Sequence, residues 1–362
     1  MDTAEFSQWL EGLGRLNGEQ IALAIAKLGE FGNRTEPRSG EGVGSWPSPD
    51  AAVDEAPSTG EPGRRRGALG IERDVLGTIG DHKVETFGCA HCGAHEIIGW
   101  GRSHGLPRYR CKSCGRTFNA ATKTAMARLR KKDRWLDQAQ AMIEGVSLAK
   151  AAERCGVHPT TAYRWRHRFL SAPALDKPLL LQGIVEADET FILESFKGRR
   201  SGMTRKPRER GGKARHPGNY FENIPVLVAR DRSGATTDAV LPEDTAVCIT
   251  RALAGAVSPA NLLVCDGGRP LGAFARRAKI PVRVVPAPGK PLPGEPDIHI
   301  NNVNAYHSRL KEWLRRFHGV ATKNLPNYLG WRRGLEASAE HANPRTWLLG
   351  ALGQGAYQQL TL

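Results

Sequence analysis

Four of the seven cysteines stand in two Cys-x-x-Cys pairs, Cys89 with Cys92 and Cys111 with Cys114, and eighteen residues separate the two pairs. A glycine follows each pair and permits the tight turn that directs backbone amides toward sulfur. Two such pairs bring four thiolates to tetrahedral separation, and a spacer of about fifteen to twenty residues is typical of a zinc ribbon. The pattern predicts a closed, structural Zn²⁺ site in a reducing compartment, and it argues against a disulfide framework.

The residues between the two pairs alternate as short strands do. Ile98 and Trp100 alternate with glycine, Tyr109 lies between two arginines, and residues 105–107 (Gly-Leu-Pro) supply a turn. We therefore expect the zinc ribbon to occupy residues 80–122. Histidines at positions 91, 95 and 104 are not expected to bind the metal, because four cysteines complete its coordination shell.

A chain of 362 residues exceeds what one hydrophobic core usually supports, so several folded units are expected. Residues 1–32 carry apolar side chains at mostly three-to-four spacing, which predicts two short helices. Residues 33–70 hold seven Gly and five Pro with few large apolar groups, which predicts a disordered linker. No apolar run approaches a membrane span, and the N-terminus lacks the basic flank and apolar run of a secretory signal.

The formal charge of +15 is concentrated in two segments. Residues 101–170 contain sixteen Lys or Arg against four Asp or Glu, and residues 197–217 contain nine against one. The rest of the chain is therefore net acidic. A run of charge is often only a solvated face, but two runs beside recognisable binding motifs favour a polyphosphate partner.

Residues 130–172 predict a helix-turn-helix DNA-binding domain, with an upstream helix at 135–144. Ser147 is suited to cap the next helix, residues 156–158 to form the turn, and Pro159 to start the second helix. A recognition helix presents short polar and Arg side chains to the major groove. The second helix is predicted to direct four such residues outward: Thr160, Thr161, Arg164 and His167. The alternative is an ordinary helical hairpin.

From residue 180 onward the pattern becomes one of strands and single helices. Strands are predicted at 184–192, 224–229, 235–241, 262–265 and 282–285, and helices at 245–257, 271–278 and about 301–317. This order is that of an RNase H-like α/β domain with a mixed five-stranded sheet, predicted over residues 180–345. In that architecture an aspartate on the first strand and one at the end of the fourth lie side by side, and the last helix brings a third oxygen ligand.

Asp188 and Asp266 are the aspartates at these two positions. Asp188 interrupts an otherwise apolar strand, where an unpaired buried charge would be costly unless a metal neutralised it. Paired carboxylates would hold two Mg²⁺ ions about 3.5–4 Å apart, which clamp the attacking and leaving oxygens of a phosphodiester. By strand alternation Glu186 shares the face of Asp188 and is a candidate supporting group, whereas Glu189 is expected to point away.

Three segments, VEADETF (185–191), VCDGG (264–268) and HINNVNAYHSRLKEWLRRFHGV (299–320), follow the cysteine pairs and the helix-turn-helix. In this arrangement the chain resembles the zinc-ribbon insertion-sequence transposases of the insertion sequence 1595 type. The resemblance covers roughly residues 85–340, and the joint arrangement is more specific than any single motif.

The resemblance implies a catalytic, Mg²⁺-binding triad of Asp188, Asp266 and Asn304. In that family the third position is Asn or Glu, followed seven residues later by Lys on the same helix, and Asn304 and Lys311 have this spacing. Lys311 is accordingly expected to contact a DNA phosphate at the transposon end. An Asn ligand is neutral and should bind metal more weakly than Glu would. The neighbours Asn301 and Asn302 compete with Asn304 for the role.

The implied protein is a transposase that binds the inverted-repeat ends of its element, frees a 3′-hydroxyl and transfers it into target DNA. Its expected cofactors are one structural Zn²⁺ and two catalytic Mg²⁺, and its expected partner is double-stranded DNA. A homo-oligomer in the prokaryotic cytoplasm, at the nucleoid, is also expected. The alternatives are a transcriptional regulator with an inactive catalytic fold, which the neutral Asn304 would suit, and a nuclease of the Holliday-junction or RNase H type.

The basic run at 197–217 falls between the first and second predicted strands. A loop rich in Gly, Arg and Lys is expected to order on a phosphate backbone, the alternative being a solvated insertion without a role. His299, just before the last helix, is a further candidate for a substrate contact. The basic residues chosen as DNA contacts in this loop are Arg199, Arg200, Arg205 and Lys206.

Overall fold

The computed structural model describes residues 66–199, 201–203, 205–206, 212, 215–216, 218, 221–286, 290–337 and 342–353. The chain divides into two compact units, Met1–Gly63 and Arg64–Leu362, and only the second contains described residues. The helices predicted within residues 1–32, and the linker up to residue 65, lie outside the described residues. No helix in the described part is both long and apolar enough to cross a membrane.

The first described element is helix α3 (Arg66–Phe87), which the sequence analysis does not predict. Its first five residues, 66–70, fall in the predicted linker and are helical instead. Four glycines in this segment lower its intrinsic helix propensity, so the helix depends on tertiary contacts that the sequence pattern does not reveal. Leu76 and Ile79 are buried, and the hydroxyl of Tyr109 donates a hydrogen bond to the Asp81 carboxylate.

Strands β1 (Ile97–Ser103), β2 (Leu106–Cys111) and β3 (Thr117–Phe118) form a small antiparallel sheet in that order. The turn between β1 and β2 contains Gly105, whose φ of 84° lies in the region that favours glycine. Tyr109 and Phe118 pack with two of the cysteines on the inner side. The strands predicted on either side of the Gly-Leu-Pro turn are therefore present.

The helix-turn-helix follows, with α4 (Trp135–Ile143), α5 (Leu148–Arg154) and α6 (Pro159–Phe169), after a short 3-10 turn at Lys132–Arg134. The Ser147 hydroxyl accepts a hydrogen bond from the Lys150 amide, as expected of a helix cap, and Pro159 is the first residue of α6. The three predicted helices are all present.

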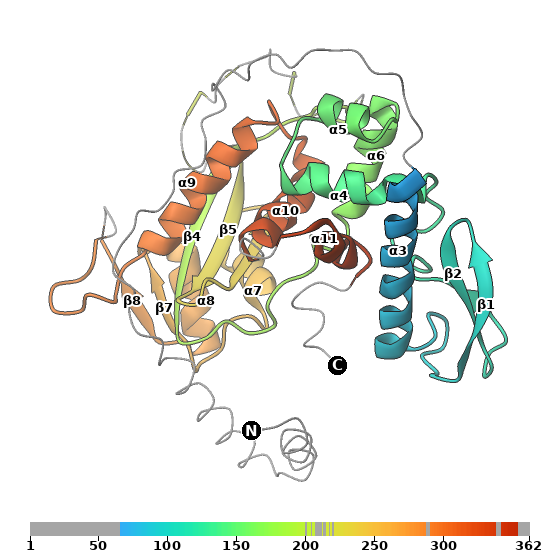
Figure 1. Ribbon diagram of the computed structural model, residues 1–362. Helices are drawn as coiled ribbons and strands as arrows, with labels where there is room; N and C mark the ends of the chain where they lie inside the picture. Colours follow the sequence, from blue (N-terminus) through green and yellow to red (C-terminus); the bar gives the residue numbers. More distant parts are fainter. Residues whose placement is uncertain are drawn as a thin grey trace, which may run out of the picture. The chain divides into compact units, whose positions relative to one another are not determined.

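The second sheet has five strands in the order β6-β5-β4-β7-β8 (Figure 1). β4 (Ile184–Leu193) runs antiparallel to β5 (Asn223–Asp231) and parallel to β7 (Leu262–Cys265). β6 (Thr236–Val240) and β8 (Val282–Val284) form the edges. The helices among and after the strands are α7 (Ala246–Leu253), α8 (Arg269–Ala278) and α9 (Asn301–Arg315). The predicted mixed five-stranded sheet, with its order of elements, is confirmed.

One face of this sheet is covered by α7 and α8. Alternate residues of the strands, such as Val185, Ala187 and Leu227, pack there against Ile249 of α7 and Phe274 of α8. This core is mainly aliphatic. It is stabilised by burial of apolar area, which contributes roughly 25 cal/mol per Å².

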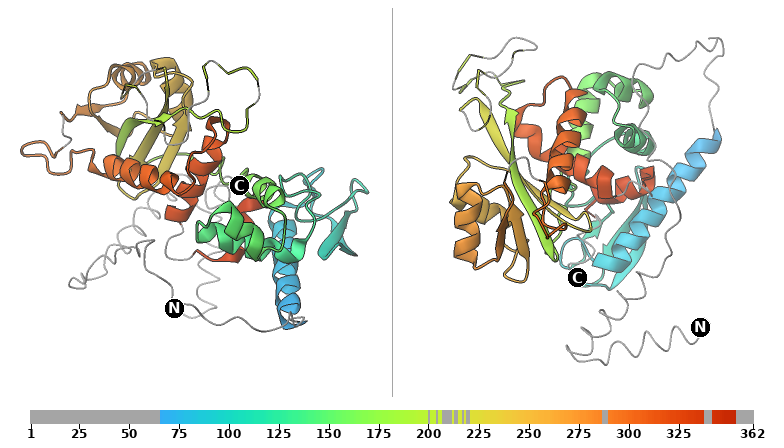
Figure 2. Two further views of the ribbon diagram at one scale, coloured as in Figure 1. Left: turned by 90° about the horizontal axis from the view of Figure 1, so that it is seen from above. Right: turned by 90° about the vertical axis from the view of Figure 1, so that its left-hand side faces the viewer.

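The other face is covered by α9 and two helices that the sequence analysis does not predict, α10 (Leu325–Ala337) and α11 (Pro344–Ala351). Figure 2 (right) shows the sheet between α8 on one side and α10 and α11 on the other. This second core is rich in aromatic rings. Trp313, Tyr328 and Trp331 contact one another, and the indole N–H of Trp331 donates to the carbonyl of Met142 in α4.

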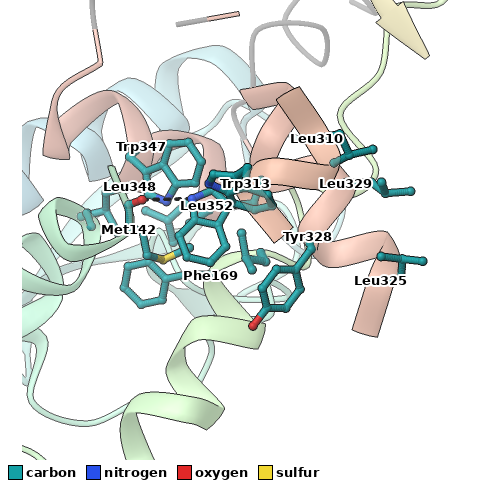
Figure 3. Packing of buried hydrophobic residues seen from close by; sticks show 14 of the residues in the cluster. Met142, Phe169, Leu310, Trp313, Leu325, Tyr328, Leu329, Trp347, Leu348 and Leu352 are labelled. Carbon is teal, nitrogen blue, oxygen red and sulfur yellow. Dashed lines mark hydrogen bonds between the residues drawn. The ribbon is translucent and has the colours of Figure 1, made fainter. Parts of the chain in front are cut away.

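The helix-turn-helix shares this aromatic core with the sheet domain. Phe169 of α6 and Met142 of α4 lie in one cluster with Trp313 and Trp347 (Figure 3). Arg333 and Asp238, both about 3% exposed, form a buried ion pair between α10 and β6. The predicted units 130–172 and 180–345 are thus packed together through one core, because α10 and α11 extend from the sheet domain onto the helix-turn-helix.

Candidate functional site

The four cysteines lie together, with all four sulfur atoms within 4.8 Å of one another. The Sγ atoms of Cys89 and Cys114 are 3.8 Å apart, and those of Cys92 and Cys111 are 3.7 Å apart. A tetrahedral zinc ion with bonds of about 2.3 Å has sulfur–sulfur edges of about 3.8 Å. The cluster therefore fits a structural zinc ion.

A cleft of about 1160 Å³ opens beside β4 and α9. Its lining includes five polar residues of these two elements whose side chains lie on this side of the sheet: Asp188, Asn304, His307, Lys311 and Arg315. Asn304, His307 and Lys311 are spaced three and four residues apart, so they occupy one face of α9. The cleft thus joins three of the residues singled out in the sequence, Asp188, Asn304 and Lys311.

Asp188 is half-buried in the middle of β4, on the face that α9 covers. Its carboxylate Oδ2 lies 3.5 Å from Nδ1 of His307, which is its one ion-pair partner within the described residues. No Lys or Arg of the described part forms a salt bridge with it. The carboxylate is therefore open to a cation from solution.

Asp266 follows directly after β7 and is exposed. The parallel register between β4 and β7 ends at the pair Glu186 and Val264, and Asp188 and Asp266 each lie two residues further along the chain. The charges of both aspartates act on Glu189, which indicates that the two carboxylates lie in the same region. Gly267 has a φ of 90°, and a Cβ there would lie 2.8 Å from the Val284 side chain, so glycine is required at this turn. The amide of the next glycine donates to Asp266 Oδ1 and orients the carboxylate. Asp266 is not among the residues that line the cleft.

Glu186 connects β4 to the start of α9. Its side chain is 1% exposed, and its carboxylate accepts hydrogen bonds from the Val303 amide and from Arg232, with His299 Nδ1 at 3.2 Å. His299, proposed above as a substrate contact, is engaged in this cluster. The amide groups at a helix N-terminus attract a carboxylate, so Glu186 fixes the end of α9 that carries Asn304.

Glu189 points to the opposite face of β4, as strand alternation predicts, where it meets Asp244 just before α7. Burial, followed by the charge of Asp244, raises the pKa of Glu189 to about 8. Asp188 and Asp266 raise it further, and Asp266 also helps raise the pKa of the partly buried Asp244. These four carboxyl groups, from the middle of β4, the residue after β7 and the segment before α7, form an acidic cluster.

The competitors for the third position differ from Asn304 in their surroundings. Asn301 is exposed and Asn302 is half-buried at the start of α9, and neither lines the cleft. Sequence reasoning missed His307 and Arg315, although their spacing of three and eleven residues from Asn304 places them near its helix face. It also missed Arg232, which the sequence presents only as a residue of a hairpin turn.

The predicted DNA-contacting residues of α6 fall into two groups. Thr160 and Arg164 are exposed and Thr161 is half-buried. His167 instead packs between Tyr163 and Tyr328 of α10, with Asn327 Nδ2 at 3.2 Å from its Nδ1. Burial, followed by the charges of Arg166 and Lys323, lowers the pKa of His167 to about 4. His167 therefore belongs to the contact between α6 and α10.

The predicted contacts in the basic insertion also divide. Arg199 and Lys206 are exposed, whereas Arg200 lies outside the described residues. Arg205 is 15% exposed, donates to the backbone of Glu194 and lies over the ring of Phe196. Phe196 is a buried apolar anchor that the sequence reading of this loop overlooks, and it holds Arg205 away from solvent.

A helix-turn-helix packed against a mixed five-stranded sheet, with one aspartate on β4 and another directly after the neighbouring parallel strand β7, is the arrangement of a transposase-like protein. Residues 180–332 match the family described as ISXO2-like transposase domain, and residues 128–175 match a homeodomain-like domain. Over 255 residues the chain is 32% identical to an uncharacterized protein in transposable element ISH50 of Halobacterium salinarum, covering 67% of this chain and 82% of that protein. The chain belongs to the transposase family of the insertion sequence 1595 type.

Solved structures of DNA-processing assemblies resemble the chain only weakly. A simian T-cell lymphotropic virus intasome matches at a TM-score of 0.26 and 13% identity, over 57% of this chain and 69% of that one. A pre-cleavage Mos1 transpososome matches at 0.24 and 13% identity, over 63% and 78%. Likeness at this level carries no argument about function.

Proposed function

We propose that this transposase cuts DNA at the ends of its insertion sequence and joins the freed 3′-hydroxyl to target DNA. Asp188, Asp266 and Asn304 are the proposed catalytic residues. The observation that supports this assignment is that Asn304 and Lys311 line the same cleft as Asp188, while Asp266 directly follows β7, the strand that pairs in parallel with β4. The sheet is best described as RNase H-like.

The donor set suits Mg²⁺, which prefers carboxylate and amide oxygens. Within the described residues no Lys or Arg forms a salt bridge with Asp188, and the charges of Asp188 and Asp266 raise the pKa of the neighbouring Glu189, so a cation would relieve this repulsion. Asp266 does not line the cleft that contains Asp188 and Asn304. This is compatible with a site for two ions, because the ions would lie about 3.5–4 Å apart and the three ligands need not meet at one point. When bound, the ions polarise the phosphodiester and stabilise charge on the attacking and leaving oxygens.

The protein's own residues have distinct roles in this scheme. Asp188 and Asp266 would hold the ions beside β4 and the end of β7. Glu186 fixes the helix that carries Asn304, and Lys311 meets a DNA phosphate. Water attacks the phosphodiester at the element end and breaks its bond to the 3′-oxygen, which leaves as a 3′-hydroxyl. This hydroxyl then attacks a target phosphodiester, forms a new bond to its phosphorus and displaces the target's own 3′-hydroxyl. Neither step requires a covalent enzyme intermediate, so no Ser or Tyr nucleophile is needed.

The rest of the chain supports DNA binding in this proposal. Thr160, Thr161 and Arg164 contact bases or phosphates in the major groove, and Arg199, Arg200 and Lys206 contact the backbone. The cysteine cluster holds Zn²⁺ and stabilises the ribbon. Synapsis of two element ends requires a dimer or larger assembly. We propose residues 1–32 as an element for self-association or for binding the ends. We place its action in the prokaryotic cytoplasm, at the nucleoid.

The test is a strand-transfer assay with labelled element ends and Mg²⁺ or Mn²⁺. The parent protein is expected to cut and join the DNA, whereas Asp188→Asn and Asp266→Asn bind the same ends without doing either. Glu312→Gln, an exposed change on α9, is the matched control and is expected to retain activity. If all of these proteins bind the ends and none cuts them, a transcriptional regulator with an inactive catalytic fold replaces this proposal.

A further inference from the structure

His307 is a polar side chain in the cleft to which the proposed triad gives no role. It lies on α9 one turn after Asn304, and its side chain is 7% exposed. Its Nδ1 faces Asp188, whereas its Nε2 is buried without a hydrogen-bond partner in the described part of the chain. Buried polar groups in native proteins are nearly always satisfied. Since Nε2 has no such partner, the contact of Nδ1 with Asp188 is the feature that must explain why a histidine is buried here.

The separation between His307 and Asp188 indicates what that function is. The distance of 3.5 Å between Nδ1 and Oδ2 exceeds the usual N–H···O range of about 2.7–3.2 Å. Two donor atoms that each lie about 2.1 Å from one ion, at angles of about 90–110°, are about 3.0–3.5 Å apart. The pair is therefore spaced as two ligands of one ion, at the outer end of that range.

The spacing along α9 supports the same conclusion. Asn304 and His307 are three residues apart, so both project from one face of the helix. Helical metal sites use this i, i+3 arrangement, with an oxygen donor followed by His, in carboxylate-bridged di-iron proteins. Both side chains line the cleft that Asp188 enters from β4.

We propose that His307 is a nitrogen ligand of the divalent ion that Asp188 and Asn304 bind, and that the site consequently prefers Mn²⁺ to Mg²⁺. Imidazole nitrogen suits transition metals, whereas Mg²⁺ selects oxygen ligands. A neutral nitrogen donor also completes a ligand set in which Asn304 supplies no charge. The inference rests on the proposed function, since it concerns the metal of the same site.

The decisive experiment is electron spin-echo spectroscopy of Mn²⁺ bound to the untagged, zinc-loaded full chain, with calorimetric titration of Mn²⁺ and Mg²⁺. The parent protein is expected to give the ¹⁴N coupling of a directly bound imidazole. His307→Gln should lose this coupling and bind Mn²⁺ at least about tenfold more weakly. Its Mg²⁺ affinity should change less than about threefold. His82→Gln, an exposed change on α3, is the control and should match the parent protein.

His307→Phe keeps a ring of similar size in the buried position, so it replaces His307→Gln if the glutamine variant unfolds. The inference is overturned if the parent binds Mn²⁺ without ¹⁴N coupling, or if the variants weaken Mn²⁺ and Mg²⁺ equally. Asp188→Asn separates the two claims. If that variant binds Mn²⁺ as tightly as the parent does, the metal site of the proposed function fails, whatever the role of His307.

Discussion

The cysteine cluster and the acidic cleft are both candidate metal sites, but their ligands reach them in different ways. The cysteines come from two adjacent turns of one small ribbon, and their sulfur atoms are already at ligand separation. The residues proposed for the cleft come from β4, β7 and α9, and only the folded sheet brings them near one another. A closed site of the first kind supports stability, whereas an open site of the second kind leaves positions for substrate.

The largest effect is expected from removing metal from the cysteine cluster. Binding of structural zinc can contribute on the order of 10 kcal/mol to the folding of a small domain. Chelation, or Cys111→Ser, should release one zinc per chain, unfold the ribbon and lower the Tm. Metal content by mass spectrometry and circular dichroism measure this. An unchanged Tm after complete zinc loss would remove the contrast between the two sites.

The acidic cleft should show the opposite result, with a large loss of activity and no loss of stability. Asp188→Asn is expected to reduce strand transfer at least 10³-fold, equivalent to about 4 kcal/mol of barrier, because a ligand of the catalytic ions is lost. Its Tm should not fall, since the change removes one charge from a repelling acidic cluster. Parallel activity and thermal unfolding measurements test this, and a large fall in Tm would show that Asp188 is structural.

Changing Glu186 should lower both stability and strand-transfer activity, each by less than in the two preceding cases. Glu186→Gln weakens its contacts with Arg232 and the Val303 amide, and a loss of about 2 kcal/mol in unfolding free energy is expected. Strand transfer should also fall, because the start of α9 and Asn304 shift. Denaturant unfolding and single-turnover kinetics measure the two effects. Lost stability with full activity would mean that Glu186 does not position Asn304.

The smallest effect concerns His167, a polar group closed within the α6–α10 contact. Its folded-state pKa of about 4 lies below the ordinary value of 6.5, so between these pH values the unfolded chain binds a proton that the folded chain does not. Stability should therefore fall as pH drops from 6.5 toward 4. His167→Phe should reduce this fall while keeping the ring contacts. Thermal unfolding at several pH values tests this, and identical pH profiles for the two proteins would contradict it.

The sequence predicts the elements whose patterns are local. The cysteine spacing, the Ser147 cap and the five strands are all readable because propensity and periodicity agree with the fold. Helix α3 is not, because its glycines oppose a helix that tertiary contacts stabilise. Helices α10 and α11, which join the helix-turn-helix to the sheet domain, were likewise not predicted.

The residues of the candidate site also divide into those that a local sequence pattern reveals and those that only the fold reveals. Asp188 is conspicuous as a charge in an apolar strand, and Asp266 as the end of another, but Asn304 and Lys311 were chosen by resemblance to a family. His307 and Arg232 were missed because their significance comes from partners more than forty residues away. The sequence pattern predicts that His167 and Arg205 face outward as polar DNA contacts. In the fold both side chains instead pack against aromatic residues.

The most direct test of the account is anomalous diffraction from crystals of the protein bound to an element end and soaked in Mn²⁺. Two peaks are predicted beside the middle of β4 and the end of β7, about 3.5–4 Å apart, with Asp188 and Asp266 each about 2.0–2.3 Å from an ion. An absence of density between these carboxylates, or Mn²⁺ bound only elsewhere with the two side chains turned apart, would contradict it.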